Sequence, residues 1–181
     1  MAKMTYLEEL TKVSTRADIL LRAPQVAVDR RADDPSLGTP TAPVELVMFG
    51  DFQGSAYARL AAVMARVREL FGARLRVVFK PMPADDAASV DAAEAGVCAQ
   101  AQGKFWPFHD SLLGAAGALD RARFDAVASA AGMNRAAFDA CLDNPATRDR
   151  LLLALDDARR YDIPGSGSIL VNGRLAPEPP S

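Results

Sequence analysis

Residues 44–79 read VELVMFGDFQGSAYARLAAVMARVRELFGARLRVVF and decide the fold of this chain. Residues 44–49 form a nearly continuous apolar run, which is typical of a strand buried on both faces in the middle of a sheet. Apolar residues then recur at helical spacing over 60–71, and Gly72 is a typical helix stop. Residues 75–79 form a second buried strand. Because such crossovers are right-handed and join parallel strands, this stretch predicts an α/β fold.

The chain becomes helical after this unit and then forms a hairpin. Residues 87–162 carry four or five helical patterns separated by glycines and by an Asn-Pro pair. Asp120 is the expected N-cap of one of these helices. Residues 168–175 predict a β-hairpin, because Asn172-Gly173 is the strongest two-residue turn signal.

The remaining organisation follows from the N-terminal residues. Residues 1–24 contain an amphipathic helical pattern over 5–22, and residues 25–43 read as a short strand followed by a polar linker rich in Pro and Gly. We expect the main domain to span 44–181, with the helical insertion at about 87–162.

Composition narrows the possible functions. Of the 181 residues 50% are hydrophobic and 24% are charged, enough for one sizeable core. The net charge of -2 excludes the basic surface that nucleic acid requires. Glu8 and Glu9 interrupt any signal-peptide pattern, and no apolar run is long enough to span a membrane. We therefore expect a cytoplasmic protein as the sequence is written, or a periplasmic or extracytoplasmic one if the chain is a fragment of a longer precursor.

The two cysteines, Cys98 and Cys141, lie far apart, and each falls within a helical pattern. Isolated cysteines of this kind are most often small buried residues. We expect both thiols to be reduced, buried and slow to react.

The order of these elements resembles the DsbA-like thioredoxin family, in which a helical subdomain interrupts a thioredoxin fold. The resemblance covers about residues 40–176 and rests on five motifs in register. These are VELVMFGDFQ at 44–53, VVFKPMP at 77–83, AAEAGVCA at 92–99, GKFWPFHDSLL at 103–113 and VNGR at 171–174.

The family resemblance implies dithiol-disulfide exchange by a Cys-Xaa-Xaa-Cys motif at a helix N-terminus. The motif would occupy 54–57, but these positions are Gly54, Ser55, Ala56 and Tyr57, so both sulfurs are missing.

Two further features of the family are also missing. The family commonly carries a buried acid six residues before the first cysteine, where this chain has Met48. A cis-proline normally precedes the hairpin, and Gly167 takes its place. We call residues 54–57, Met48 and Gly167 the relict active site, and we expect no catalytic residue there.

The sequence therefore predicts a redox-inactive module that binds a peptide or protein, or a second copy of itself, without a cofactor. The candidate groove residues are Phe52, Tyr57, Ser166, Gly167 and Ser168. Whether Tyr57 lines that groove or partly fills it stays open at this stage.

Three alternatives remain. Ser55 could serve a glutathione-dependent transferase or isomerase, since kappa-class glutathione transferases are similar in fold. However, Ser55 falls one position after the first cysteine's place, and a helix N-cap is the more frequent use of such a serine. Cys98 could support a residual thiol activity. The chain could also be only a structural domain of a larger assembly.

Other polar and aromatic residues have simpler interpretations. His109 is the only histidine and lacks neighbours at metal-ligand spacing, so we expect a packed or capping residue and no metal site. The acid pairs at 33–34, 85–86 and 156–157 read as solvated surface. The aromatic cluster within 105–108 is expected in the core between the two subdomains.

The C-terminal residues suggest a gap in the fold. In the family a helix follows the hairpin and covers one sheet face, yet residues 176–181 contain three prolines, which exclude a helix. We expect the helix predicted at 5–22, from the same chain or from a second copy, to cover that face.

Overall fold

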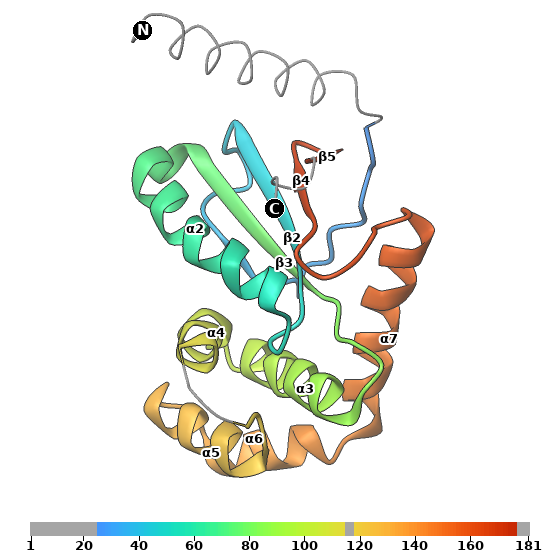
Figure 1. The fold of residues 1–181 in the computed structure, drawn as a ribbon. Coiled ribbons are helices and arrows are strands. Elements are labelled where there is room, and N and C mark those ends of the chain that lie inside the picture. Colours follow the sequence, from blue (N-terminus) through green and yellow to red (C-terminus); the bar gives the residue numbers. More distant parts are fainter. Residues whose placement is uncertain (1–24, 115–117, 177–181) are drawn as a thin grey trace, which may run out of the picture.

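A computed structural model describes residues 25–114 and 118–176 (Figure 1). The elements, in chain order, are β1 (Ser36–Leu37), β2 (Val44–Gly50), α2 (Ser55–Phe71), the 3-10 helix η1 (Gly72–Arg74), β3 (Leu75–Pro81), α3 (Ala87–Ala101), α4 (Phe105–Leu113), α5 (Arg121–Ala130), α6 (Arg135–Leu142), α7 (Pro145–Arg160), β4 (Ile169–Val171) and β5 (Arg174–Leu175).

The strands form one mixed sheet in the order β1-β3-β2-β4-β5. Strands β2 and β3 are parallel, as the crossover predicts, and β2 is the central strand. The hairpin is also confirmed, because Asn172 and Gly173 both have positive φ, which a tight primed turn requires. Asn172 fixes this turn to the sheet, since its side-chain oxygen accepts a 2.7 Å hydrogen bond from the Glu45 amide.

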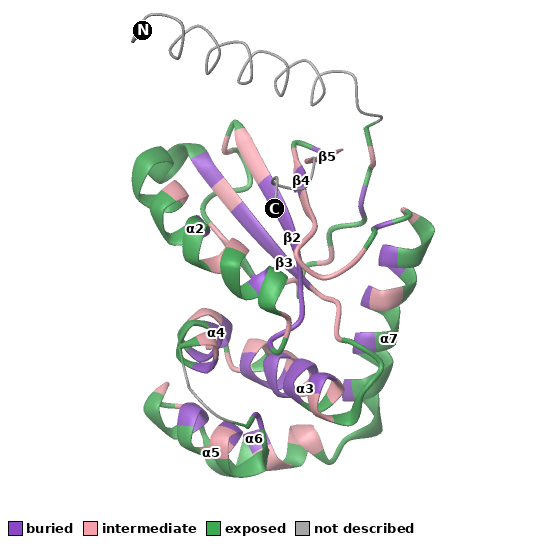
Figure 2. Cartoon of the chain, viewed as in Figure 1, coloured by how far each residue is buried: buried purple, intermediate pink, exposed green. Residues whose placement is uncertain are grey.

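Each face of the sheet carries its own apolar core (Figure 2). Leu46 and Met48 face α2, α3 and α4 and belong to the larger core. Val47, Phe49 and Leu170 face the other way and pack in a smaller core. Alternating residues of one strand thus hold two helical layers together. The smaller core also contains Val28, Val78, Ala158 and Ile163.

The helical insertion is organised around α3, which packs against α4, α6 and α7. Asp120 caps α5 as predicted, accepting a 2.9 Å hydrogen bond from the Arg123 amide. The prediction for the cysteines is wrong: Cys98 on α3 and Cys141 on α6 form a disulfide, with Cα atoms 5.7 Å apart. Two helical patterns 43 residues apart became neighbours through packing that their local sequences do not reveal.

A buried ion cluster joins the second face of the sheet to α7. Lys80 follows Val78 on that face and is fully buried, with its ammonium 2.7 Å from Asp34 and 3.5 Å from Asp157. Arg31 also contacts the Asp157 carboxylate through both terminal nitrogens, at 2.8 and 3.1 Å. The interpretation of these acids as solvated surface is therefore wrong for Asp34 and Asp157, because a buried lysine requires nearby anions.

The predicted linker also differs from the structure. Residues 25–43 include β1, which pairs antiparallel with β3, and Gln25 bridges to Arg174 of β5. The helix predicted at 5–22 and the last residues, 177–181, lie outside the described part of the chain.

Candidate functional site at the start of helix α2

Helix α2 begins at the relict active site. Gly54 is its N-cap and offers no side-chain hydrogen bond, while its amide bonds to the Asp51 carbonyl at 2.9 Å. Ser55 is the first helical residue and is exposed, so the N-cap expectation for its hydroxyl is wrong by one position. None of the described residues hydrogen-bonds the Ser55 side chain.

The loop before α2 is held by Asp51, a buried acid whose function the sequence reasoning missed. Its carboxylate accepts hydrogen bonds from the Gln53 amide at 3.0 Å and from the Ser89 hydroxyl at 3.1 Å. The Asp51 amide donates to the Ser166 hydroxyl at 2.8 Å. Asp51 thus ties three segments together. Its position directly after a buried parallel strand was the available signal, because such strand ends converge at functional edges.

Tyr57 stands where the family has its second cysteine, and its side chain is fully buried. Its hydroxyl lies 2.7 Å from Nε2 of His109, while Nδ1 of His109 lies 2.7 Å from the Asp110 carboxylate. Burial raises the pKa of Tyr57 far above its ordinary value, so the hydroxyl stays protonated. The expectation that His109 is packed is confirmed, since it is 3% exposed.

Aromatic rings enclose this hydrogen bond. The His109 ring lies 5.7 Å from Phe52, 5.5 Å from Phe105 and 5.3 Å from Trp106. Gly50 makes room for the Tyr57 ring, because a Cβ at position 50 would meet its Cε2 at 2.5 Å. The rings therefore belong to the core between the subdomains, as predicted for the cluster at 105–108. The Tyr57 ring is part of this core and does not line an open groove.

The loop at 165–168 lies against the first turn of α2. Gly167 has φ of +93°, a conformation closed to proline, and no described residue follows a cis peptide bond. A Cβ at Gly167 would lie 2.9 Å from the Ala56 Cβ. The Gly167 amide donates to the Phe49 carbonyl at 2.8 Å, which anchors the loop to β2.

The structure thus brings the predicted positions together but buries some of them. Met48 is 1% exposed in β2 and pairs with Ile169 and Phe79 on neighbouring strands. Phe52 and Tyr57 are buried, while the segment 166–168 is half-buried. No group of three or more possible metal ligands occurs within residues 25–114 and 118–176.

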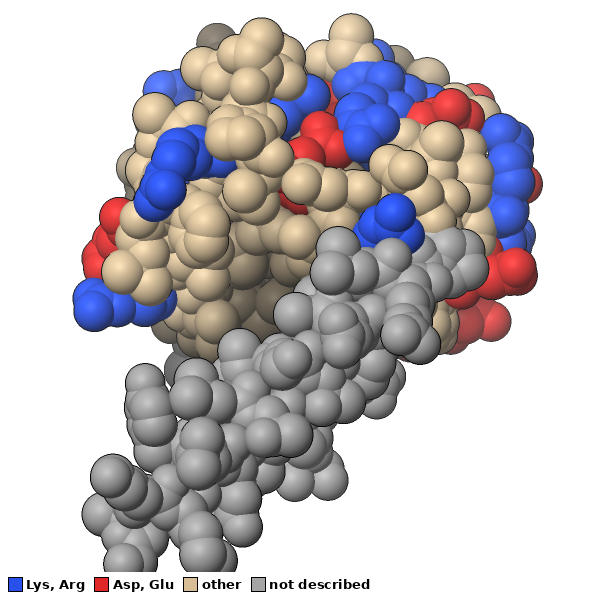
Figure 3. Space-filling model, turned by 90° about the horizontal axis from the view of Figure 1, so that it is seen from above, with Lys and Arg blue, Asp and Glu red and all other residues tan. Residues whose placement is uncertain are grey.

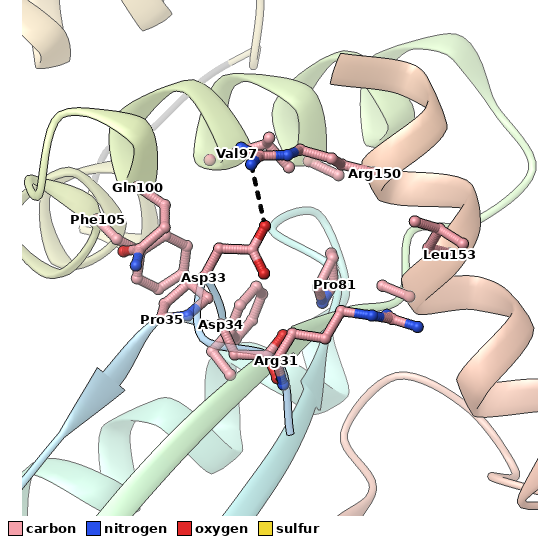
Figure 4. Close-up of a pocket in the computed structure, with 14 residues that line it drawn as sticks. Arg31, Asp33, Asp34, Pro35, Pro81, Val97, Gln100, Phe105, Arg150 and Leu153 are labelled. Atoms are coloured by element: carbon pink, nitrogen blue, oxygen red, sulfur yellow. Dashed lines mark hydrogen bonds and ion pairs between the residues drawn. The ribbon is translucent and has the colours of Figure 1, made fainter. Parts of the chain in front are cut away.

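A separate cavity of about 70 Å³ lies between the loop at 31–35, α3 and α7 (Figure 4). Phe105 and Leu153 are among its apolar lining residues, and an ion pair of 3.2 Å between Asp33 and Arg150 crosses it. None of the relict active-site residues lines this cavity.

Comparison with known proteins establishes the family. The thioredoxin family profile matches residues 30–181, so the chain belongs to the thioredoxin family. Its fold is the DsbA-like form, with a helical subdomain inserted into the thioredoxin sheet.

Curated relatives include the Na(+)/H(+) antiporter NhaA 1 of Mycolicibacterium gilvum, which is 30% identical over 141 residues, 76% of this chain. A Herminiimonas arsenicoxydans NhaA antiporter is 30% identical over 137 residues. The chain spans only 23% and 22% of the length of these two relatives.

Solved structures share the fold. BdbD from Bacillus subtilis matches with a TM-score of 0.75 and 18% identity, covering 86% of this chain and 89% of that one. A thioredoxin-like oxidoreductase from Silicibacter pomeroyi gives 0.71 and 24%, covering 81% and 84%. A periplasmic thioredoxin-like protein from Salmonella enterica gives 0.72 and 18%, covering 83% and 84%.

These findings overturn the expectation of a cytoplasmic protein. The Cys98–Cys141 disulfide is typical of an oxidising compartment and points to an extracytoplasmic location. Among the described residues, no helix is long and apolar enough to cross a bilayer.

Proposed function

We propose that this chain is a redox-inactive DsbA-like module that binds an extended peptide or a protein surface at its relict active site. The observation that carries the proposal is Tyr57, whose buried ring occupies the place of the resolving cysteine and bonds to His109. Dithiol exchange requires a thiolate stabilised at a helix N-terminus. The first turn of α2 contains no sulfur, and both cysteines of the chain are joined elsewhere.

The remaining surface supports binding better than catalysis. Ser55 and Ala56 are exposed beside the half-buried segment 165–168, so backbone and small side chains form an accessible patch. A Ser55-based enzyme receives no support, because an activated serine needs an adjacent base and none of the described residues bonds its hydroxyl. The likeness to segments of antiporters agrees with a module that acts within or beside a larger protein.

An insulin-reduction assay with dithiothreitol tests the redox half of the proposal. The wild-type rate should equal the background rate, while Gly54→Cys/Tyr57→Cys should exceed it and so show that the assay detects this scaffold. Wild-type turnover comparable to a working DsbA-like protein would refute the proposal. If the wild type shows such turnover and the Cys98→Ala/Cys141→Ala variant does not, the activity belongs to the two cysteines of the helical subdomain.

Site-specific photocrosslinking tests the binding half. A benzoylphenylalanine at Ala56 should crosslink to a reduced, alkylated unfolded protein, whereas the same probe at Ala136, an exposed alanine of α6, should not. Equal crosslinking at both positions, or none at Ala56, would argue against binding at the relict active site.

A further inference from the structure

One flank of α2 is apolar and lacks a partner among the described residues. Val63 and Leu70 are 59% and 61% exposed, although they lie two turns apart on the same line of the helix. Leu60 and Val67 flank these two residues on the side of the helix that faces the core, and they are only half-buried. An apolar stripe two turns long therefore faces outward along α2.

The sheet continues this apolar surface. Ile169 and Val171 of β4 pair with Met48 and Leu46, so all four project from the face that carries α2. Val44 projects from the same face and, like Ile169 and Val171, is only half-buried. We call the surface formed by the α2 stripe and these strand residues the open flank.

The open flank differs in character from the rest of the surface. Viewed from the end of the molecule where β2 begins, the surface is hollowed over a tract without charged side chains (Figure 3). Contiguous apolar surface of this kind usually marks an interaction site. On the opposite face of the sheet, Val28, Ala158 and Ile163 are buried in the smaller core.

We propose that residues 5–22 of the same chain fold back as a helix and dock on the open flank. The attachment point supports this occupant. Val26 donates a hydrogen bond to the Gly173 carbonyl, and Gln25 bridges to Arg174, which fixes the end of the segment beside the β4–β5 turn. That turn bonds to Glu45, so the segment departs from one end of the open flank.

Length and pattern also match. Eighteen helical residues extend about 27 Å, and the 17 residues of α2 extend about 25 Å, at about 1.5 Å per residue. The sequence predicts an apolar stripe formed by Tyr6, Leu10, Val13, Ala17 and Leu20, with spacings of four and three residues. A stripe of this kind can pack against the parallel stripe on α2.

The attachment point fixes the direction in which the segment runs, and the charges agree with it. Val44 pairs with Leu75, which places the end of α2 beside the start of β2 and therefore near the exit of the segment. A docked segment then runs back toward the start of α2. This brings Glu9, which flanks the predicted stripe, level with Arg59, which has no ion-pair partner in the described part of the chain and lies beside the apolar stripe of α2.

Hydrogen exchange on the full chain tests this docking, with two adjacent residues of α2 as a matched pair. Val63→Glu places a charge on the open flank, while Ala62→Glu places the same charge on the exposed side of the helix. Amides of residues 5–22 should be protected about tenfold or more in the wild type and in Ala62→Glu. Val63→Glu should abolish that protection while residues 75–81 stay protected, which shows that the domain remains folded.

Two results would overturn the proposal. Residues 5–22 that exchange at the unprotected rate in the wild type would show that the segment does not dock. If residues 5–22 are protected only at protein concentrations at which light scattering detects a dimer, then a second copy, and not the same chain, covers the open flank.

Discussion

The two buried polar clusters on opposite faces of the sheet hold the fold in different ways. On the α2 face, Tyr57 and His109 share one hydrogen bond inside a shell of aromatic rings. On the other face, Lys80 and Asp157 are fully buried and form the centre of an ion cluster. The first cluster depends mainly on the packing of the rings around this hydrogen bond. The second joins distant segments by charge, so its members depend on one another.

The largest expected effect comes from breaking the ion cluster. Asp157→Ala leaves Lys80 and Arg31 without their shared carboxylate, and removing one partner of a buried pair costs about 3–5 kcal/mol. Urea denaturation should show this loss. Asp156→Ala, which removes the exposed partner of Arg160, should change stability by less than about 1 kcal/mol. Similar losses for both variants would contradict a buried cluster.

The disulfide should rank next. Reduction of Cys98–Cys141 should lower the free energy of unfolding by about 2–4 kcal/mol, because the bond closes a long loop in the unfolded chain. Thermal melts with and without a phosphine reductant measure this change. The control is Cys98→Ala/Cys141→Ala, whose melting temperature should not respond to the reductant. If the wild-type melting temperature does not change with the reductant, although a thiol titration shows that the disulfide was reduced, the disulfide does not stabilise the fold.

Tyr57→Phe should have a smaller effect. The variant keeps the ring but leaves Nε2 of buried His109 without its partner, which costs about 1–3 kcal/mol. Tyr161→Phe is the matched control, because the Tyr161 hydroxyl has no hydrogen bond among the described residues, and its change should stay below about 0.5 kcal/mol. If the two variants unfold at the same denaturant concentration, the Tyr57–His109 bond contributes little.

The smallest effect concerns Asp110. Its hydrogen bond with His109 holds the pKa of this carboxyl below the ordinary value. A lowered folded-state pKa gives stability that is present above about pH 4 and is lost as the pH falls through the folded value. Because the side chain is largely exposed, Asp110→Asn should cost only about 0.5 kcal/mol at pH 7. The difference from wild type should shrink below pH 4, and a difference that grows there would contradict this assignment.

The sequence predicts most of the scaffold because its signals are local. The apolar runs of β2 and β3 and the Asn172-Gly173 turn each specify their own structure. The disulfide could not be predicted in this way, because it depends on α3 and α6 packing together. The ion cluster left one local signal: Lys80 extends a buried apolar strand, and a charge in that position requires partners.

The candidate site, too, could be predicted only where its signals are local. Aligning the motif placed Gly54, Ser55, Ala56 and Tyr57 correctly at the start of α2. Burial of the Tyr57 ring could not be predicted, since it depends on Gly50 and on His109 from the helical insertion. Asp51 was not predicted because three of its hydrogen-bond partners, Ala84, Ser89 and Ser166, come from segments that are remote in sequence.

The contact between Gly167 and Ala56 limits which residues can stand at position 167. A proline at 167 could not adopt the φ of +93°, and even a bare Cβ there would press on Ala56 at 2.9 Å. Cysteines placed at 54 and 57 would leave the loop at 165–168 in its present shape. A proline at 167 would instead require a different loop conformation and a displaced start of α2. The loop and the first turn of α2 are therefore fitted to each other, and the cis-proline form of the family requires both to change together.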